Sequence, residues 1–200
     1  MKRRFFIKSG GAVAVCSLMI SEVSANLACQ PTNFPPMLDC RAGIDSNLAF
    51  INARRQTESQ WCWAACIEMI FSYYGYSISQ ANIVSSTWGQ VVNMPATDNQ
   101  IMHDLNSYWT DDRGMGFQTI SQPVQNGMAA QELAANYPLI VCTQGHAMVL
   151  TSLLYRTNPH TTWGQDIEAV VRDPWQNRGR RILTEQEWFG RNLLLAIRIV

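Results

Sequence analysis

This 200-residue sequence has no long apolar run and very little lysine. No apolar run reaches the roughly 18 residues that span a bilayer, so we expect no membrane-spanning helix and no stable membrane insertion. No lysine follows Lys8, and internal repeats and low-complexity segments are also absent. Hydrophobic residues make up 47% and charged residues 15% of the chain, which is typical of a globular protein and argues against disorder. The length suits one domain with its own core.

The first 25 residues have the features of an export signal. A basic start at positions 2–4 precedes a short apolar run at positions 11–20, and Val23-Ser24-Ala25 fits the small-x-small cleavage pattern. The adjacent arginines resemble a twin-arginine signal, with an ordinary secretory signal as the alternative. A lipoprotein signal ending at Cys29 is disfavoured because Asn26 replaces the aliphatic residue it needs. We therefore expect a periplasmic or secreted protein, cleaved near Ala25.

Cleavage after Ala25 leaves a mildly acidic chain. Eleven basic side chains remain, all of them arginine, against 14 acidic ones, so the net charge is about −3 with neutral histidines. This balance provides no basic surface for nucleic acid or for an anionic membrane. We expect neither as a partner.

An odd number of cysteines remains after this cleavage. One of the six leaves with the signal, and an exported chain with five cysteines has one unpaired thiol. Cys29 and Cys40 flank a proline-rich segment and could close a local loop. Cys66 and Cys142 could pair if the helix and the strand that carry them face each other. With both disulfides formed, Cys62 is the unpaired thiol.

The pattern of apolar residues predicts helices first and a sheet second, which is an α+β arrangement. From Ser59 to about Tyr74 the spacing is that of a mostly buried helix, with Thr57 or Ser59 as its cap and Gly75 at its end. Further helices are expected at 79–88, 97–109 and 127–137, after an irregular or helical entry at 46–55; strands are expected at 139–142, 147–155, 167–172, 181–183 and 193–200.

Cys62 stands where a catalytic thiol would be activated. It lies in the first turn of the predicted helix, whose N-terminus carries partial positive charge that stabilises a thiolate. His146 begins a predicted strand, and an antiparallel out-and-back path of 27 residues can return Asp173 beside it. Asp173 would then hold the histidine in its working tautomer. The side-chain amide of Gln56, with the backbone N–H of Cys62, would form an oxyanion hole.

At these positions the sequence resembles the papain-like cysteine peptidases. Gln56 precedes Cys62 by six residues as in that family, and Trp63 follows the cysteine. Trp175 lies two residues after Asp173, where the family has a tryptophan that shields the partner of the histidine. The third catalytic residue is aspartate rather than the asparagine of papain.

The motifs are most similar to a bacterial branch of this family. Trp-Cys-Trp-Ala-Ala, Gly145-His146 and Asp173-Pro174 resemble the avirulence-type effector proteases and the bacteriocin-leader-processing peptidases. The resemblance covers residues 46–200, after an extended segment at 26–45 and the signal at 1–25. It implies a papain-like fold with a buried catalytic helix packed on a C-terminal antiparallel sheet. The chain is shorter than plant papains and lacks their usual disulfide motif.

The resemblance implies a thiol protease without cofactor or metal, acting on a protein or peptide, and we expect a monomer. Two further hypotheses remain open: the same site could hydrolyse peptidoglycan peptides, deamidate or transglutaminate, or the chain could be a non-enzymatic binding module. A zinc site from Cys62, Cys66, His103 and His146 is disfavoured because no second close ligand pair exists. The missing lysines could reflect drift, avoidance of self-cleavage, or protection from lysine-directed modification in a eukaryotic host.

Overall fold

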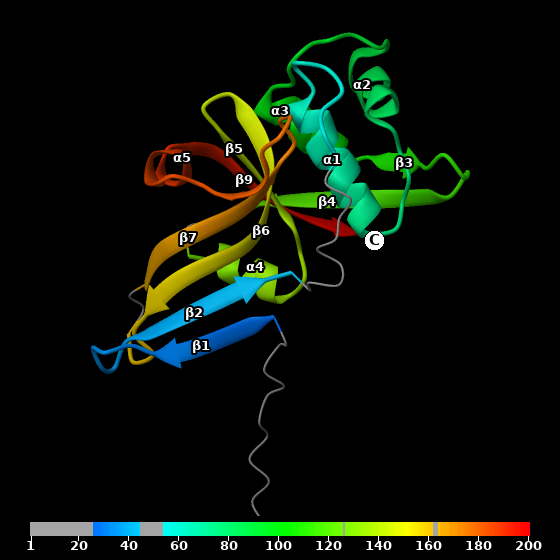
Figure 1. The fold of residues 1–200 in the computed structure, drawn as a ribbon. Coiled ribbons are helices and arrows are strands. Elements are labelled where there is room, and N and C mark those ends of the chain that lie inside the picture. Colours follow the sequence, from blue (N-terminus) through cyan, green and yellow to red (C-terminus); the bar gives the residue numbers. More distant parts are fainter. Residues whose placement is uncertain (1–25, 45–53, 126, 162–163) are drawn as a thin grey trace, which may run out of the picture.

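A nine-stranded sheet organises the protein in the computed structural model, which describes residues 26–44, 54–125, 127–161 and 164–200 (Figure 1). The helices and the antiparallel sheet form an α+β fold, as the sequence predicts. The expected export signal at 1–25 and most of the expected entry at 46–55 lie outside the described residues.

The central helix α1 spans Cys62–Tyr73 and packs against strand β6. Eight of its twelve residues are buried, which explains why its sequence is apolar on nearly every side. Its N-cap is Trp61, without a side-chain cap hydrogen bond, so the expected cap by Thr57 or Ser59 is wrong. The N–H groups of the first turn are therefore not bound by a capping side chain. The helix ends before Gly75, whose positive φ of 87° suits glycine.

The other helices are short, and the longest has nine residues. They are α2 (Gln80–Trp88), α3 (Asp98–Asp104), α4 (Ala129–Ala134) and α5 (Glu185–Phe189). Ser79 caps α2 and Thr97 caps α3. The expected helix at 97–109 stops at Asp104 because Trp109 belongs to a strand and pairs with Phe117.

The strands follow the order β1-β2-β6-β5-β9-β4-β3. Off this path, β7 pairs with β6 and with β8. Every strand pairing is antiparallel. Their bounds are β1 Leu27–Pro31, β2 Leu38–Gly43, β3 Tyr108–Thr110, β4 Gly116–Pro123, β5 Leu139–Thr143, β6 His146–Thr157, β7 Gly164–Asp173, β8 Gly179–Ile182 and β9 Arg191–Ile199.

Strand β6 connects the two ends of the sheet. Its first half, from His146 to Leu150, pairs with β5, and its second half, from Ser152 to Thr157, pairs with β2. The hairpin β1–β2 therefore extends the sheet at the end far from His146. A disulfide between Cys29 and Cys40, which lie opposite each other, joins the two strands as predicted.

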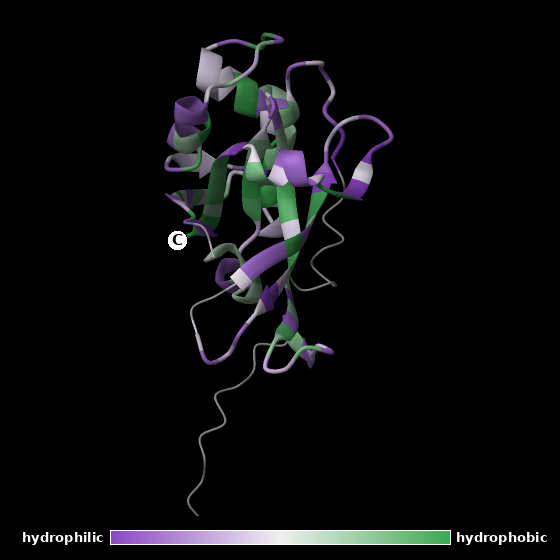
Figure 2. Ribbon diagram, turned by 90° about the vertical axis from the view of Figure 1, so that its left-hand side faces the viewer, coloured by the Kyte–Doolittle hydropathy of each residue, from purple (hydrophilic) through white to green (hydrophobic). Residues whose placement is uncertain are grey.

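Hydrophobic residues concentrate in the strands in the middle of the molecule, and hydrophilic residues in its outer helices and loops (Figure 2). The core joins α1 to β5, β6 and β9. Cys66 and Cys142 are both buried there as free thiols, so the expected second disulfide is wrong, and Cys62 is not the sole unpaired cysteine. Cys142 lines a surface cleft whereas Cys66 lies wholly in the core. No helix in the described ranges is long and apolar enough to cross a membrane.

Candidate active site

Cys62 is the first residue of α1, and its side chain is partly exposed. The first turn contains no acidic residue, so nothing there opposes the positive end of the helix dipole. The backbone N–H groups of Trp63 and Ala147 lower the pKa of this thiol. The start of α1 is therefore built to hold a thiolate.

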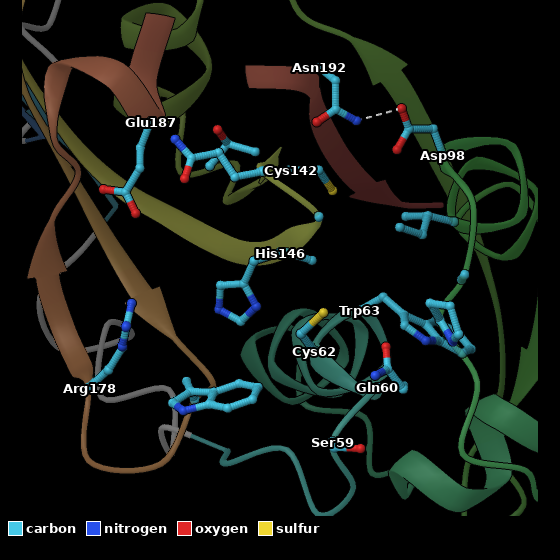
Figure 3. A pocket seen from close by; sticks show the side chains of 18 of the residues that line it. Ser59, Gln60, Cys62, Trp63, Asp98, Cys142, His146, Arg178, Glu187 and Asn192 are labelled. Carbon is cyan, nitrogen blue, oxygen red and sulfur yellow. Dashed lines mark hydrogen bonds between the residues drawn. The ribbon is translucent and has the colours of Figure 1, made fainter. Parts of the chain in front are cut away.

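A tight turn places His146 beside the start of α1. Gln144 and Gly145 join β5 to β6 with φ values of 52° and 75°, a pair of positive angles typical of a two-residue hairpin turn. Thr143 and His146 face each other across that turn. His146 is thus fixed as the first residue of β6, and Figure 3 shows its ring beside Cys62 at the end of α1.

Asp173 ends β7, the antiparallel neighbour of β6, and its carboxylate contacts His146. The two residues are 2.8 Å apart from Nε2 of His146 to Oδ1 of Asp173. Asp173 is only 3% exposed, and its Oδ1 also accepts the backbone N–H of Trp175 at 2.9 Å. Because Nε2 faces the aspartate, Nδ1 is the ring nitrogen left for Cys62.

The three groups shift one another's proton affinities in the direction that a thiolate–imidazolium pair requires. Burial alone would raise the pKa of Cys62, but hydrogen bonds from His146 and from two backbone N–H groups lower it. Burial would lower the pKa of His146, yet Asp173 and Cys62 raise it to about 9. Burial works against ionised Asp173 as well, and its donors nevertheless hold its pKa well below the usual range.

The other two free thiols have the opposite character. Burial raises the pKa of Cys66 well above the usual thiol value and that of Cys142 to about 12. Both are therefore protonated at neutral pH and poorly nucleophilic. Among the free thiols described, Cys62 alone has a lowered pKa.

The tryptophans around Cys62 belong to the core and also anchor a wall of the cleft. The indole N–H of Trp61 donates to the carbonyl of Val92 at 2.8 Å, and that of Trp63 donates to the carbonyl of Met94 at 3.2 Å. Trp175 is 46% exposed and meets His146 edge to face, with ring centroids 6.0 Å apart. It covers the histidine beside its contact with Asp173.

Gln56 lies beside this group with its amide engaged in the backbone. Its Nε2 donates to the carbonyls of Glu58 and Ser59, both at 3.0 Å, and its own N–H donates to the carbonyl of Pro174 at 2.9 Å. Gln56 is 5% exposed, and its Oε1 is buried without a partner among the described residues. Neither amide N–H points to an oxyanion position while both carbonyls are bound.

A cleft of about 530 Å³ opens over Cys62 and His146. The residues predicted to line it, Trp63, Gly145 and Trp175, all do so. Asn192 of β9 and Asp98 of α3 lie at its far side and are joined by a 2.8 Å hydrogen bond (Figure 3). The cleft is thus bounded by helix α3 and the loop before it on one side and by the sheet on the other.

A zinc site does not form from the residues considered for it. Within the ranges that the structure describes, no group of three or more His, Cys, Asp and Glu side chains could hold a metal ion. His103 lies on α3, exposed to solvent, and its Nδ1 is 3.7 Å from Asp104. It takes no part in the cleft.

Sequence reasoning missed three charged residues that belong to this site, one of which is Arg178, whose Nη1 lies 3.7 Å from Oδ2 of Asp173. The other two are Arg181 and Glu187. Arg181 of β8 donates from Nε to Oδ2 of Asp173 at 2.7 Å, and Glu187 of α5 binds the other end of the same guanidinium. Both line the cleft. A signal was present in the spacing, since strand alternation and a hairpin after Asp173 return Arg181 to the face of the sheet that carries the carboxylate.

Comparison with known proteins identifies one matching family. Residues 46–193, more than half of the chain, match the family described as "Papain-like cysteine protease AvrRpt2". No curated protein sequence is significantly similar to the chain.

The solved structures that match the chain include two peptidases. The peptidase domain of Streptococcus ComA, a bi-functional ABC transporter involved in a quorum sensing pathway, is 18% identical, with 74% of this chain and 96% of that one covered at a TM-score of 0.49. A double glycine motif protease from an AMS/PCAT transporter, in complex with the leader peptide, is 17% identical, with 72% and 87% covered at a TM-score of 0.43.

Proposed function

This chain belongs to the family of the papain-like cysteine protease AvrRpt2, and from that premise we propose that it is an exported peptidase with a Cys62–His146–Asp173 triad. Family membership makes it a cysteine-type peptidase. The assignment of the triad is carried by one observation: the half-buried thiol with the lowered pKa lies beside a histidine that an ionised, buried aspartate orients. Its substrate is a protein or a peptide.

The reaction begins with the thiolate of Cys62 and the imidazolium of His146. The sulfur attacks the scissile carbonyl carbon, and the carbonyl oxygen becomes an oxyanion beside the start of α1. His146 gives its Nδ1 proton to the leaving amine as the C–N bond breaks, which leaves a thioester on Cys62. A water molecule, deprotonated by His146, then hydrolyses this acyl-enzyme and regenerates the thiolate. Asp173 keeps the ring oriented throughout.

The oxyanion would be bound by the backbone N–H of Cys62 and by the amide of Gln56. For the second contact, Gln56 has to release the carbonyl of Glu58 or of Ser59 as substrate enters. Its position supports this role, because its backbone is fastened to Pro174, the residue after Asp173. The backbone of Gln56 is thereby kept beside the end of β7 that carries Asp173.

Export is proposed from the signal-like segment that ends at Ala25, and the disulfide between Cys29 and Cys40 fits an oxidising compartment. An effector protease acting in a host cell is one form of this proposal. A wall hydrolase or an acyl transferase would use the same triad, so the substrate decides among these options.

The substrate class is tested by incubating the mature enzyme with denatured protein and, separately, with purified peptidoglycan. Cys62→Ala serves as the inactive control in both reactions, and cleavage is followed by mass spectrometry of the products. Peptide-bond cleavage of the denatured protein by wild type alone is expected. Release of peptidoglycan fragments without protein cleavage would replace the proposal with a wall hydrolase.

A further inference from the structure

We propose that Arg181 and Glu187 are a positioning pair that fixes the carboxylate of Asp173 for His146, and that α5 serves to hold this pair in place. The inference rests on the proposed function, because it concerns the same triad. Neither residue contacts the sulfur or the histidine ring in the described contacts; both act through Asp173.

The guanidinium of Arg181 bridges two carboxylates. Its Nε donates to Oδ2 of Asp173 at 2.7 Å, and its Nη1 and Nη2 donate to the two oxygens of Glu187 at 2.9 and 2.7 Å. Nη2 also lies 3.1 Å from the sulfur of Met148, a buried residue of β6. The side chain of Arg181 is 20% exposed, so this bridge is largely shielded from solvent.

This bridge determines which way the aspartate faces. One carboxylate oxygen, Oδ1, accepts from Nε2 of His146 and from the N–H of Trp175, while the other, Oδ2, is held by Arg181. The terminal torsion of an aspartate is broad when nothing restrains it. With Oδ2 held, Oδ1 stays directed at the histidine ring.

Helix α5 fixes the far end of the bridge. Glu187 is its third residue and forms a capping box with Thr184, accepting the Thr184 N–H at 2.8 Å. Hydrogen bonds from Arg181 lower the pKa of Glu187 to about 2, so the carboxylate is ionised at every physiological pH. Arg181 lies on the inner face of β8, opposite Val171 of β7, and Arg180 lies on the outer face. Strand and helix thus converge on one guanidinium.

A positioning role and a pure charge effect shift the pKa of His146 in opposite directions. Removing the positive charge of Arg181 through space would raise that pKa, since the neighbouring anions would be less neutralised. Loss of the hydrogen bond that Nε2 of His146 donates to Asp173, once the carboxylate is free to rotate, would lower it.

The charged and titratable groups around the histidine come from several elements. They are Cys62 of α1, Cys142 of β5, Asp173 of β7, Arg178 before β8, Arg181 of β8 and Glu187 of α5.

The test measures inactivation by an epoxysuccinyl cysteine-peptidase inhibitor as a function of pH. This measurement gives the maximal inactivation rate constant, kinact, and the binding constant of the inhibitor, KI, separately. It does not require the natural substrate. The variants are Arg181→Gln, Arg181→Lys and Glu187→Gln. Arg181→Lys keeps the charge but lacks the planar fork of guanidinium donors, and Glu187→Gln keeps the capping box. Arg180→Gln removes the same charge from the outer face of the same strand and is the matched control.

We expect Arg181→Gln to lower kinact about 10-fold or more, because a displacement of ~1 Å at a catalytic group can cost about 100-fold. KI should stay within about 2-fold of wild type, since a positioning residue does not contribute to binding. The alkaline limb of the pH profile should move to lower pH, and Arg180→Gln should match wild type. Arg181→Lys and Glu187→Gln should show the same shift with a smaller loss of rate.

Several results would overturn the inference. A shift of the alkaline limb to higher pH would leave only a charge effect, and a raised KI with unchanged kinact would make Arg181 a substrate contact. If Arg181→Gln does not fold, as judged by circular dichroism, Arg181→Lys decides by the same criteria. Wild-type enzyme that resists the inhibitor would refute the proposed function itself, whereas equal inactivation of wild type and Arg181→Gln would refute only the positioning role.

Discussion

At the scale of single residues, one thiol differs from two others in its surroundings. Cys62, Cys66 and Cys142 are all free, yet only Cys62 stands at a helix start with a histidine and backbone N–H groups around its sulfur. The sequence predicts that Cys62, His146 and Asp173 act together, because their residue types and spacing match a chemical task, and the structure brings the three side chains to one place. Arg181 was missed although strand alternation carried a signal, because an arginine that binds a buried carboxylate looks like any surface arginine until the register of its strand is known.

Replacing Asp173 by asparagine should lower the pH above which the enzyme loses activity. The carboxylate of Asp173, one of the two groups that raise the pKa of His146 to about 9, would be lost, so this pKa should fall toward the ordinary value of about 6.5. Because the active pair contains imidazolium, activity at pH 8 should drop about 10-fold or more, while activity near pH 6 is less affected. The pH profile of kcat/KM measures this shift. Glu185→Gln, an exposed charge change, is the control, and an unmoved alkaline limb would contradict the assignment of Asp173.

Replacing Gln56 by alanine tests whether its amide reaches the oxyanion. Loss of an oxyanion donor costs on the order of 100-fold in kcat. KM should change little, because the contact forms only in the transition state. Gln56→Glu keeps the size but removes the N–H donors, so it should be equally impaired. A kcat within about 2-fold of wild type in both variants would restrict Gln56 to its contacts with the carbonyls of Glu58 and Ser59.

At the scale of elements, the long apolar segments were predictable and the polar strands were not. The periodicity located α1 and the strands β5, β6, β7 and β9 within a few residues, since each buries a hydrophobic face. Strand β4 was not predicted, because two of its inward residues, Thr119 and Ser121, are polar. Gly116 and Pro123, at its two ends, are also typical of turns. The two inward hydroxyls find partners such as the carbonyl of Ser107 and the amide of Asn106, which only the tertiary structure provides.

The hairpin β1–β2 should contribute stability and not catalysis. Its disulfide closes a loop with a sequence separation of 11, and such a constraint on the unfolded chain is worth about 3 kcal/mol. The hairpin pairs with β6 from Ser152 onward, ~20 Å along the strand from His146 at 3.3 Å per residue. The double variant Cys29→Ser/Cys40→Ser should therefore unfold at lower denaturant concentration with unchanged kcat/KM. A folded double variant with lost activity would show that the hairpin acts on the site.

At the scale of the whole molecule, the fold places the helix start and the strand end that the chemistry needs on the two sides of one cleft. The helix α1 brings Cys62, and the sheet brings His146 and Asp173 on neighbouring antiparallel strands. Where the protein acts is a separate matter, which depends on the segment before Asn26.

Expression with its own N-terminus in a bacterium should release a mature chain that begins at Asn26. The basic start, the apolar run and the Val23-Ser24-Ala25 site favour cleavage at this point. Intact-mass measurement of the exported fraction locates the new terminus. The double variant Arg3→Lys/Arg4→Lys keeps the charge and should block export if the twin-arginine route is used. An uncleaved chain confined to the cytoplasm would contradict the proposed localisation.

The most direct test of the central claim is covalent labelling of the active thiol. An epoxysuccinyl inhibitor is incubated with wild type and with Cys62→Ala at neutral pH, and intact mass with peptide mapping locates the adduct. We predict one adduct in the wild type, on Cys62, and none in the variant, because the raised pKa values of Cys66 and Cys142 leave those thiols unreactive. Equal labelling of both proteins, or labelling of neither, would contradict the assignment of Cys62 as the nucleophile.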